Sequence, residues 1–255
     1  MTQLRNRNKK AKELETLVEK PLFPMRINKY LALKNYSTRR GADDIVTAGK
    51  VFINGRVAVL GDKVTETDSI DVKYRGKTAP TFVYLSYNKP VGLTTNDDVS
   101  EKGIVASLPK EMQKLKLFPV GRLDKESSGL IILTNDGRVT DRLLNPKHEH
   151  EKTYEVTTAK PLRDNFKEKI EAGLNIEGYV TKPALAKQIA EKKFTITLTE
   201  GKTHQVRRMV SALYNEVRAL KRVSIMNIRL GNLAPGTTRT LEGKELETFL
   251  KSLDL

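Results

Sequence analysis

The sequence contains no cysteine, only three histidines and no long hydrophobic run. The lack of cysteine excludes disulfides, thiolate nucleophiles and zinc sites built on cysteine. His148, His150 and His204 do not have the spacing of a metal-ligand set. No apolar segment approaches the roughly 20 residues that a membrane span requires, and the first residues lack the apolar centre of a signal peptide. We therefore expect a cytoplasmic protein without a membrane partner.

Acidic residues are also few for the number of basic ones. The 255 residues include 46 Lys and Arg against 31 Asp and Glu, which gives a net charge of +15. Such an excess indicates a polyanionic partner, above all nucleic acid. Hydrophobic residues make up 38% of the chain, which is enough for a packed core and for one large or two ordinary domains.

Residues 1–23 are polar and mostly basic, and we interpret them as a flexible tail. Residues 24–72 have the pattern of two short helices and a small sheet, with a hairpin signal at Asn54-Gly55. Basic residues accompany the two helices, which contain almost no acid before Asp43. They include Arg26, Lys29, Arg39 and Arg40. An ordinary solvated surface is one explanation, but this stretch resembles an S4 domain, a small RNA-binding module, which implies that these cations bind RNA.

A polar linker at 73–81 precedes a longer unit, residues 82–255. Strand patterns here alternate irregularly with helical ones, for example the apolar run at 130–134 and the amphipathic segment around Phe166 and Ile170. We predict an α+β fold with a mixed, largely antiparallel sheet and flanking helices.

The segment EGKTHQVRRM, residues 200–209, contains a misleading signal. Its Gly-Lys-Thr resembles the end of a phosphate-binding loop, but Ile196 occupies the position where that loop needs a glycine. We therefore exclude nucleotide hydrolysis. The helix predicted after it has one apolar face and one basic face. The apolar face comprises Val206, Met209, Val210, Leu213 and Tyr214, and the other comprises His204, Arg207, Arg208 and Ser211. An ordinary amphipathic helix explains this pattern as well as an anion-binding one.

Asp124, in the stretch VGRLDKESSGL, is a carboxylate in a basic chain, close to Arg122. It has two interpretations. It is either a turn or N-cap aspartate before the 130–134 strand, or an ionised carboxylate aimed at an electrophilic carbon. Sequence spacing alone leaves both open.

Three ordered motifs resemble those of the pseudouridine synthases. GRLDKESSGLIILTNDG is similar to their catalytic motif, EKTYEV to their tyrosine-bearing strand, and EGKTHQVRRM to their basic motif. The stretches YNKPVG and IRLGNLAPGTTRTL, behind an S4-like module, narrow the resemblance to the RsuA-type branch that modifies ribosomal RNA. HEKTYEV and VSIMNIRL favour the F-type members of this branch, which act on RNA of the large ribosomal subunit.

The resemblance implies isomerisation of uridine in RNA to pseudouridine. Asp124 would be the essential carboxylate, Arg207 would pair with it, and Tyr154 would stack on the target base. Arg122 would fill the space that the extruded nucleotide leaves, and Lys89, His204 and Arg208 would bind the RNA. Whether Asp124 attacks the sugar, adds to the base or abstracts a proton stays open. No cofactor or metal is expected, and we expect a monomer that acts on ribosomal RNA, with transfer RNA as an additional candidate substrate.

One alternative of another class is a non-catalytic S4-type RNA-binding or ribosome-associated protein. It would need the same charge but no convergence of Asp124, Tyr154 and Arg207. A glycoside hydrolase is disfavoured because no second carboxylate accompanies Asp124 in a recognisable motif.

Overall fold

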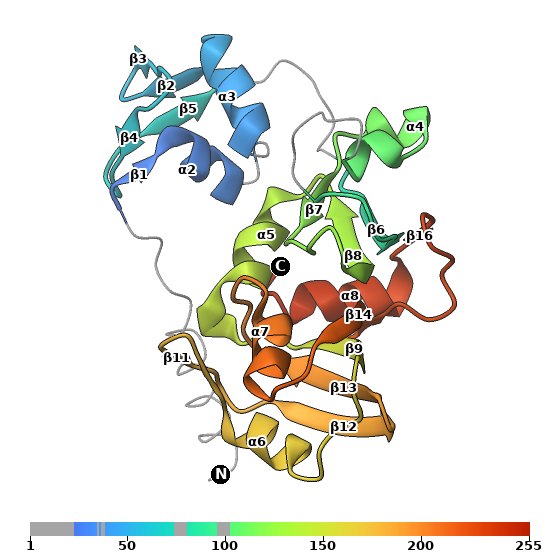
Figure 1. Cartoon of the computed structure of the whole chain (residues 1–255). Helices are drawn as coiled ribbons and strands as arrows, with labels where there is room; N and C mark the ends of the chain where they lie inside the picture. The colour runs from blue at the N-terminus through green and yellow to red at the C-terminus, as the bar shows by residue number, and fades with distance from the viewer. Residues whose placement is uncertain (1–22, 35, 37–38, 74–80, 96–102) are drawn as a thin grey trace, which may run out of the picture. The chain divides into compact units, whose positions relative to one another are not determined.

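The computed structural model describes residues 23–34, 36, 39–73, 81–95 and 103–255, although not the side chains of Arg39 and Arg40 (Figure 1). The predicted tail up to residue 22 and the linker residues 74–80 lie outside the described residues. The chain divides into two compact units between Ala79 and Pro80. Within the described residues, no helix has the length and apolar character needed to cross a membrane.

The described residues of the smaller unit form two helices and five short strands. Its elements are β1 (Met25–Arg26), α2 (Ile27–Leu33), α3 (Arg39–Thr47), β2 (Val51–Ile53), β3 (Arg56–Val57), β4 (Lys63–Val64) and β5 (Ile70–Val72). Strands β3, β2 and β5 form an antiparallel sheet in that order, and β1 pairs with β4. Ile27 and Leu31 of α2 are buried with Val46 and Val51, which gives this unit a core of its own.

The hairpin predicted at Asn54-Gly55 is confirmed, because these two residues connect β2 to β3. Both have positive φ, 52° at Asn54 and 81° at Gly55. That combination matches the right-handed twist of a two-residue hairpin, and asparagine and glycine adopt it at low cost.

The larger unit is built on one nine-stranded sheet (Figure 1). Its strands are β6 (Tyr84–Lys89), β7 (Phe118–Val120), β8 (Ser128–Thr134), β9 (Lys152–Thr158), β12 (Leu185–Ala190), β13 (Lys193–Leu198), β14 (Val217–Ile225), β15 (Ile228–Arg229) and β16 (Thr238–Thr240). The main order is β12-β13-β9-β14-β8-β6-β16, with β7 paired to β8 and β15 to β14. All these pairs are antiparallel except β14 and β8. The predicted α+β class and the largely antiparallel sheet are confirmed.

Five α-helices are found in the described part of this unit. They are α4 (Lys110–Gln113), α5 (Gly137–Leu144), α6 (Phe166–Ala172), α7 (Gln205–Ala212) and α8 (Gly243–Lys251). Two 3₁₀ turns (Val105–Ser107 and Pro146–His148) and a small hairpin of β10 (Asn175–Ile176) and β11 (Tyr179–Val180) complete it. Asp136 begins α5 by accepting the backbone N–H of Arg138, as an N-cap aspartate does.

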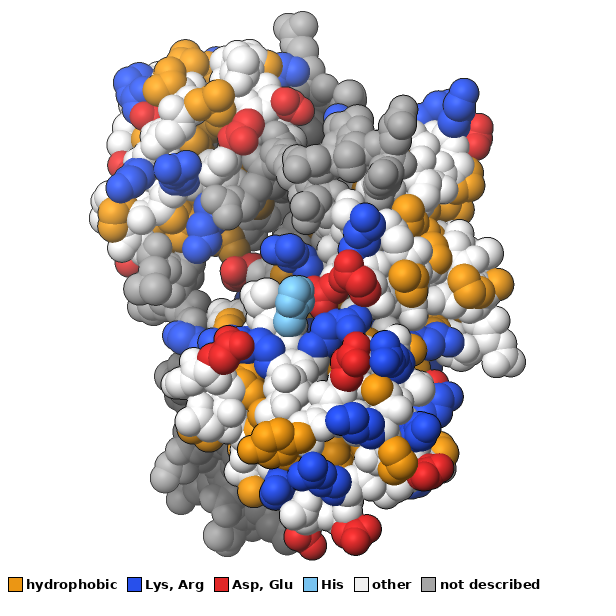
Figure 2. All heavy atoms as spheres, viewed as in Figure 1, with side chains coloured by type: hydrophobic (Ala, Val, Ile, Leu, Met, Phe, Trp, Pro, Cys, Tyr) orange, Lys and Arg blue, Asp and Glu red, His pale blue; other side chains and the backbone are white. Residues whose placement is uncertain are grey.

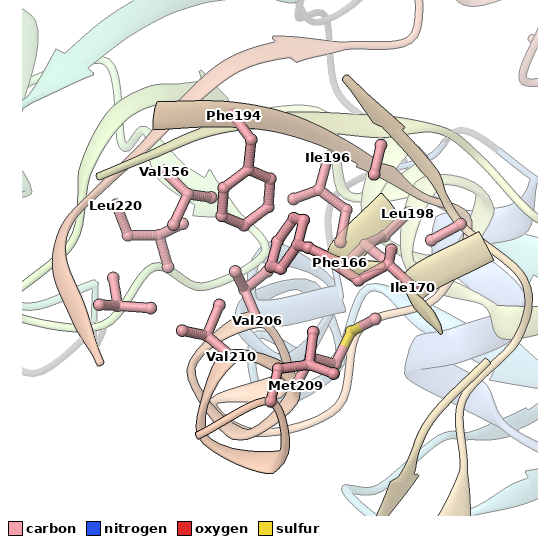
Figure 3. Close-up of a cluster of buried hydrophobic side chains, with 14 of the residues drawn as sticks. Val156, Phe166, Ile170, Phe194, Ile196, Leu198, Val206, Met209, Val210 and Leu220 are labelled. Atoms are coloured by element: carbon pink, nitrogen blue, oxygen red, sulfur yellow. The ribbon is translucent and has the colours of Figure 1, made fainter. Parts of the chain in front are cut away.

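Helices α6 and α7 pack against the part of the sheet formed by β9, β13 and β14 (Figure 3). The ring of Phe166 on α6 meets the ring of Phe194 on β13 edge-on, with centroids 4.5 Å apart. Val206, Met209 and Val210 of α7 are buried in the same cluster. A second cluster joins α5 and α8 to β6, β7 and β8. The apolar face of α7 thus anchors its N-terminal end beside the strands that carry the candidate site.

The prediction that Tyr214 belongs to the apolar face of α7 is wrong. Tyr214 is 74% exposed and has a φ of 61°. The helix ends at Ala212, so the helical periodicity no longer applies two residues later. The guanidinium of Arg163 lies 5.4 Å from the centroid of the Tyr214 ring, outside the core.

The three strands β6, β8 and β14 meet at Gly129. This glycine pairs with Lys89 on β6 and with Arg222 on β14. A Cβ at this position would lie 2.3 Å from the backbone oxygen of Arg222, and φ is +105°. Only glycine therefore permits this approach, and the loop that carries Asp124 enters β8 directly beside it.

Candidate active site

A cavity of about 360 Å³ opens in the larger unit where the loop before β8, strands β9 and β14, and the start of α7 meet. Four of the residues singled out from the sequence line it. They are Arg122, Asp124, Tyr154 and His204. The first two precede β8, Tyr154 lies in β9 and His204 directly precedes α7. Segments about 80 residues apart in the chain thus contribute to one site.

Asp124 lies in a tight turn, because its carbonyl accepts the N–H of Ser127 at 3.0 Å. Its side chain is 29% exposed and borders the cavity. The turn interpretation and the functional one are therefore compatible: the backbone of Asp124 makes the turn while the carboxylate faces the cavity.

The loop that bears Asp124 is held through Ser127, which is fully buried. Its carbonyl accepts a hydrogen bond of 2.7 Å from Lys89 Nζ. Its hydroxyl lies 3.4 Å from Arg207 Nη2, which also donates to the carbonyl of Glu126 at 3.3 Å. Contacts from β6 and α7 therefore fix the loop in position.

The partner of the Asp124 carboxylate is His204 rather than Arg207. His204 Nε2 lies 3.4 Å from Asp124 Oδ1, and among the described residues no ion pair joins Arg207 to Asp124. The expected pairing is thus absent from this structure, although Arg207 lies against the same loop. His204 adopts a left-handed conformation with a φ of 52° directly before α7. Such a conformation is uncommon outside glycine, so the sequence alone does not predict it here.

Tyr154 is half-buried in β9, between Ile196 of β13 and Arg222 of β14. It lines the cavity together with Asp124. An aromatic ring on a central strand has little freedom to move, so it offers a fixed surface against which a flat ligand can stack.

A profile of the RNA pseudouridylate synthase family matches residues 83–212, and a profile of the S4 domain matches residues 25–70. The chain is 38% identical over 232 residues to the dual-specificity RNA pseudouridine synthase RluF of Salmonella typhi, with 90% of this chain and 80% of that protein covered. This chain belongs to the RNA pseudouridine synthase family.

Two further relatives of the synthase extend this finding. This chain is 38% identical over 231 residues to the uncharacterized RNA pseudouridine synthase YtzG of Bacillus subtilis, and the alignment covers 87% of this chain and 97% of that one. The crystal structure of a pseudouridylate synthase is similar to this one, with a TM-score of 0.66 and 31% sequence identity over 88% of this chain and 99% of that one. The resemblance stated from the three motifs and the S4-like module is confirmed, and the enzyme alternative prevails over a non-catalytic protein.

Lys89 of the synthase was predicted to bind RNA, but its position does not favour a direct contact. Its side chain is fully buried, and Nζ donates to the carbonyls of Ser127 and Pro90. Burial lowers the pKa of Lys89 to about 8, although the nearby carboxylates of Glu126 and Asp124 raise it in part. Lys89 is the last residue of β6, and its hydrogen bond to the carbonyl of Ser127 holds the Asp124 loop in place.

Arg208 was also predicted to bind RNA, and its position does not favour this role either. Its Nη2 donates to the carbonyl of Ile176 at 2.9 Å and pairs with Glu177 at the same distance. The guanidinium therefore ties the β10–β11 hairpin to α7. It does not line the cavity.

Four predicted RNA contacts belong to the S4 unit. Arg26 on β1 and Lys29 on α2 are exposed. Arg39 and Arg40 begin α3, but their side chains lie outside the described residues.

On the visible face of the larger unit, Figure 2 shows Lys and Arg side chains in several places, with a histidine and a group of acidic side chains between them.

Sequence reasoning missed three cations that line the cavity, Lys152, Lys202 and Arg222. One signal could have found Lys152: it lies two residues before Tyr154 in an alternating strand, so the two share a face. Arg222 had no such signal, because its place beside Tyr154 depends on the pairing of β14 with β9.

Proposed function

We propose that this synthase converts a uridine of ribosomal RNA to pseudouridine in the cavity between Asp124 and Tyr154. The observation that supports this proposal is the convergence of Asp124, Tyr154 and Arg122 on one cavity. Relatives named for ribosomal targets add support, among them the ribosomal large subunit pseudouridine synthase B of Bacillus subtilis, 36% identical over 231 residues.

The target base has to leave the stack before the chemistry starts, because C1′ and the base edge are inaccessible inside a helix. The proposed arrangement receives the extruded base against Tyr154 and places its ribose beside Asp124. Arg207 lies against the loop of Asp124 and supplies positive charge near the phosphates, while His204 contacts the carboxylate itself. The positive charge beside Asp124 reduces the repulsion between its carboxylate and the RNA.

The experiment that tests this function is a map of pseudouridines in ribosomal and transfer RNA from cells with and without the protein. We expect at least one ribosomal position to lose its pseudouridine in the deletion strain and to regain it with the intact gene. Loss only in transfer RNA would redirect the substrate assignment, and unchanged maps of both RNAs would contradict the proposal.

Arg122 is expected to stabilise the extruded state, because it is exposed at the rim of the cavity. A guanidinium plane can occupy the gap in the stack and hydrogen-bond to the neighbouring bases, whereas an ammonium cannot. The Arg122→Lys variant should bind structured RNA normally but turn it over at least about tenfold more slowly, equivalent to about 1.4 kcal/mol. Single-turnover rates on structured RNA, and on RNA whose target uridine is unpaired, measure this effect. Equal rates of the variant and the wild type on structured RNA would reduce Arg122 to a counter-charge.

The cations of the S4 unit are expected to contact phosphates without reading sequence. A double variant, Arg26→Ala with Lys29→Ala, should reduce the salt dependence of RNA binding. If both contact single-stranded phosphates, the slope of log K against log salt falls by about 1.4. The control is Lys244→Ala with Lys251→Ala, which removes two exposed lysines near α8 and leaves the S4 unit intact. Equal changes of slope in both double variants would show that only net charge matters.

A further inference from the structure

Two cations line the cavity from within the sheet. Lys152 begins β9, and Arg222, only 3% exposed, lies in β14. Arg222 is paired directly with Tyr154, and Lys152 lies two residues before that tyrosine. Alternate residues of a strand, and residues paired across two strands, share a face. Lys152, Tyr154 and Arg222 therefore form one surface inside the cavity.

Neither cation has a carboxylate partner among the described residues. Lys152 Nζ donates to the carbonyl of His150 at 3.0 Å. Arg222 donates through Nε to the carbonyl of Leu130 at 2.7 Å and through Nη1 to that of Arg122 at 3.4 Å. Within the described part of the chain, its Nη2 is buried without any hydrogen-bond partner.

The acids that line the cavity are engaged elsewhere. Asp124 pairs with His204, and Glu200 accepts hydrogen bonds from the Tyr179 hydroxyl and the Gln205 amide. Buried charges are costly unless they are paired. Burial, together with the positive charge of Arg222, lowers the pKa of Lys152 to about 8. Two cations that repel each other inside a ligand cavity indicate that the ligand brings negative charge to them.

We propose that Lys152 and Arg222 form a subsite for the two carbonyl oxygens of the target uracil and stabilise the negative charge that the base acquires during the reaction. This proposal rests on the proposed function. It adds two catalytic residues that contact the base, one from β9 and one from β14.

The isomerisation generates this charge in each of the routes left open for Asp124. When the C1′–N1 bond breaks, both electrons stay with uracil, and the anion is spread over N1 and the two carbonyl oxygens. Meanwhile C1′ is captured by the carboxylate, or C2′ gives a proton to the carboxylate and a glycal forms. If the carboxylate instead adds to the base, the charge falls on one carbonyl oxygen as an enolate. As C5 bonds to C1′, the bond to the carboxylate breaks or the proton returns to C2′. The C5 proton then leaves and N1 gains a proton, so no electrons are exchanged with another reagent.

The base suits this subsite better than a phosphate does. A flipped nucleotide enters with its base foremost, while its phosphates stay with the RNA chain outside. Arg222 is almost completely buried and is adjacent to Tyr154, the residue proposed to stack on the base. Fixed donors at atoms that gain charge in the transition state raise the rate more than they raise affinity. A phosphate contact would instead contribute mainly to binding.

The test compares Lys152→Met, Lys152→Arg and Lys221→Met in the full-length protein. Lys221 is the neighbour of Arg222 on the other face of β14 and is absent from the cavity lining, so its variant removes the same charge outside the site. The measurements are the single-turnover rate at saturating enzyme, the dissociation constant for the same RNA, and the melting temperature.

Lys152→Met is expected to lower the saturating rate by about 10²-fold with an unchanged dissociation constant, the loss typical of one such donor. Lys152→Arg should stay within about tenfold of wild type because it retains the charge, and Lys221→Met should equal wild type. The pH profile of kcat/KM gives an independent readout. With the pKa of Lys152 lowered to about 8, activity that needs its charged form is present below that pH and falls above it. The arginine variant should lose this decline, whereas a decline caused by Lys89 would remain.

Arg222→Lys is the second variant, because it keeps the positive charge but replaces the planar guanidinium with a single ammonium group that has fewer N–H donors. It should lower the saturating rate and leave the dissociation constant unchanged. If Lys152→Met and Arg222→Lys weaken RNA binding in proportion to the rate, the subsite holds a phosphate and the proposal is wrong. A wild-type rate in folded Lys152→Met would also overturn it, while the proposed function would still stand. If wild-type protein forms no pseudouridine in any RNA, the proposed function itself fails.

Discussion

Replacement of Asp124 by asparagine is expected to abolish pseudouridine formation while RNA binding persists. Asparagine keeps the shape of the side chain but removes the charge and the nucleophilic oxygen. A loss of roughly 10⁴-fold or more is typical when a group that acts on the reacting atoms is removed. The assay is tritium release from RNA labelled at C5 of uridine, because the C5–H bond is lost when C5 bonds to C1′.

Two features make this variant informative. The contact between Asp124 and His204 is partly exposed on both sides, 29% and 55%, so its loss should cost no more than about 1 kcal/mol of folding stability. RNA affinity should stay constant or rise slightly, because one negative charge leaves a site for a polyanion. The matched control is Glu126→Gln, an equal charge change in the same loop at an exposed residue outside the cavity lining.

An active Asp124→Asn enzyme would show that the reaction does not use this carboxylate. Equal loss of activity in Asp124→Asn and Glu126→Gln would mean instead that the charge of the loop, rather than one residue, is required. Only loss in the Asp124 variant alone supports the role proposed for it.

Replacement of Gly129 by alanine is expected to destabilise the larger unit and to eliminate activity with it. The new Cβ would lie 2.3 Å from the carbonyl oxygen and 2.7 Å from the nitrogen of Arg222, both backbone atoms that cannot rotate away. The φ of +105° adds strain for any residue with a Cβ. The combined cost is about 3 kcal/mol or more, judged from typical backbone strain and overpacking.

For a domain of this size, such a loss lowers the melting temperature by roughly 10 °C. Calorimetry or circular dichroism measures the change. Gly201→Ala is the control, because Gly201 also borders the cavity but has no heavy atom within 4 Å of an added Cβ among the described residues. Its free energy of unfolding should change by less than about 0.5 kcal/mol. A Gly129→Ala variant as stable as wild type would mean that β8 and β14 do not approach as closely as the structure shows.

Activity of Gly129→Ala at low temperature, where the variant stays folded, separates geometry from stability. The parallel pairing of β8 with β14 joins the Asp124 loop to Arg222. Forcing these strands apart by even about 1 Å should lower the rate strongly, because reacting groups tolerate little displacement.

Local patterns in the sequence sufficed for much of the fold. The hairpin at Asn54-Gly55, the strand around 130–134 and the helix that buries Phe166 and Ile170 were all predictable. Each depends on residues close in the chain: a turn with positive φ, a short apolar run, and an apolar stripe with helical period. The net charge and the three ordered motifs likewise indicated an RNA-modifying enzyme without any coordinates.

The composition of the cavity was decided only by tertiary structure. Asp124 meets His204 across about 80 positions, and Arg222 reaches Tyr154 through the pairing of two strands far apart in the chain. Lys89 looked like a free cation beside a proline, yet the junction of β6, β8 and β14 buries it beneath the Asp124 loop. Sequence determines which side chains carry charge, but the dielectric and the partners around each charge come from the packing of distant segments. That packing leaves some cations, such as Arg26, exposed at the surface and buries others, such as Lys89 and Arg222, inside the sheet.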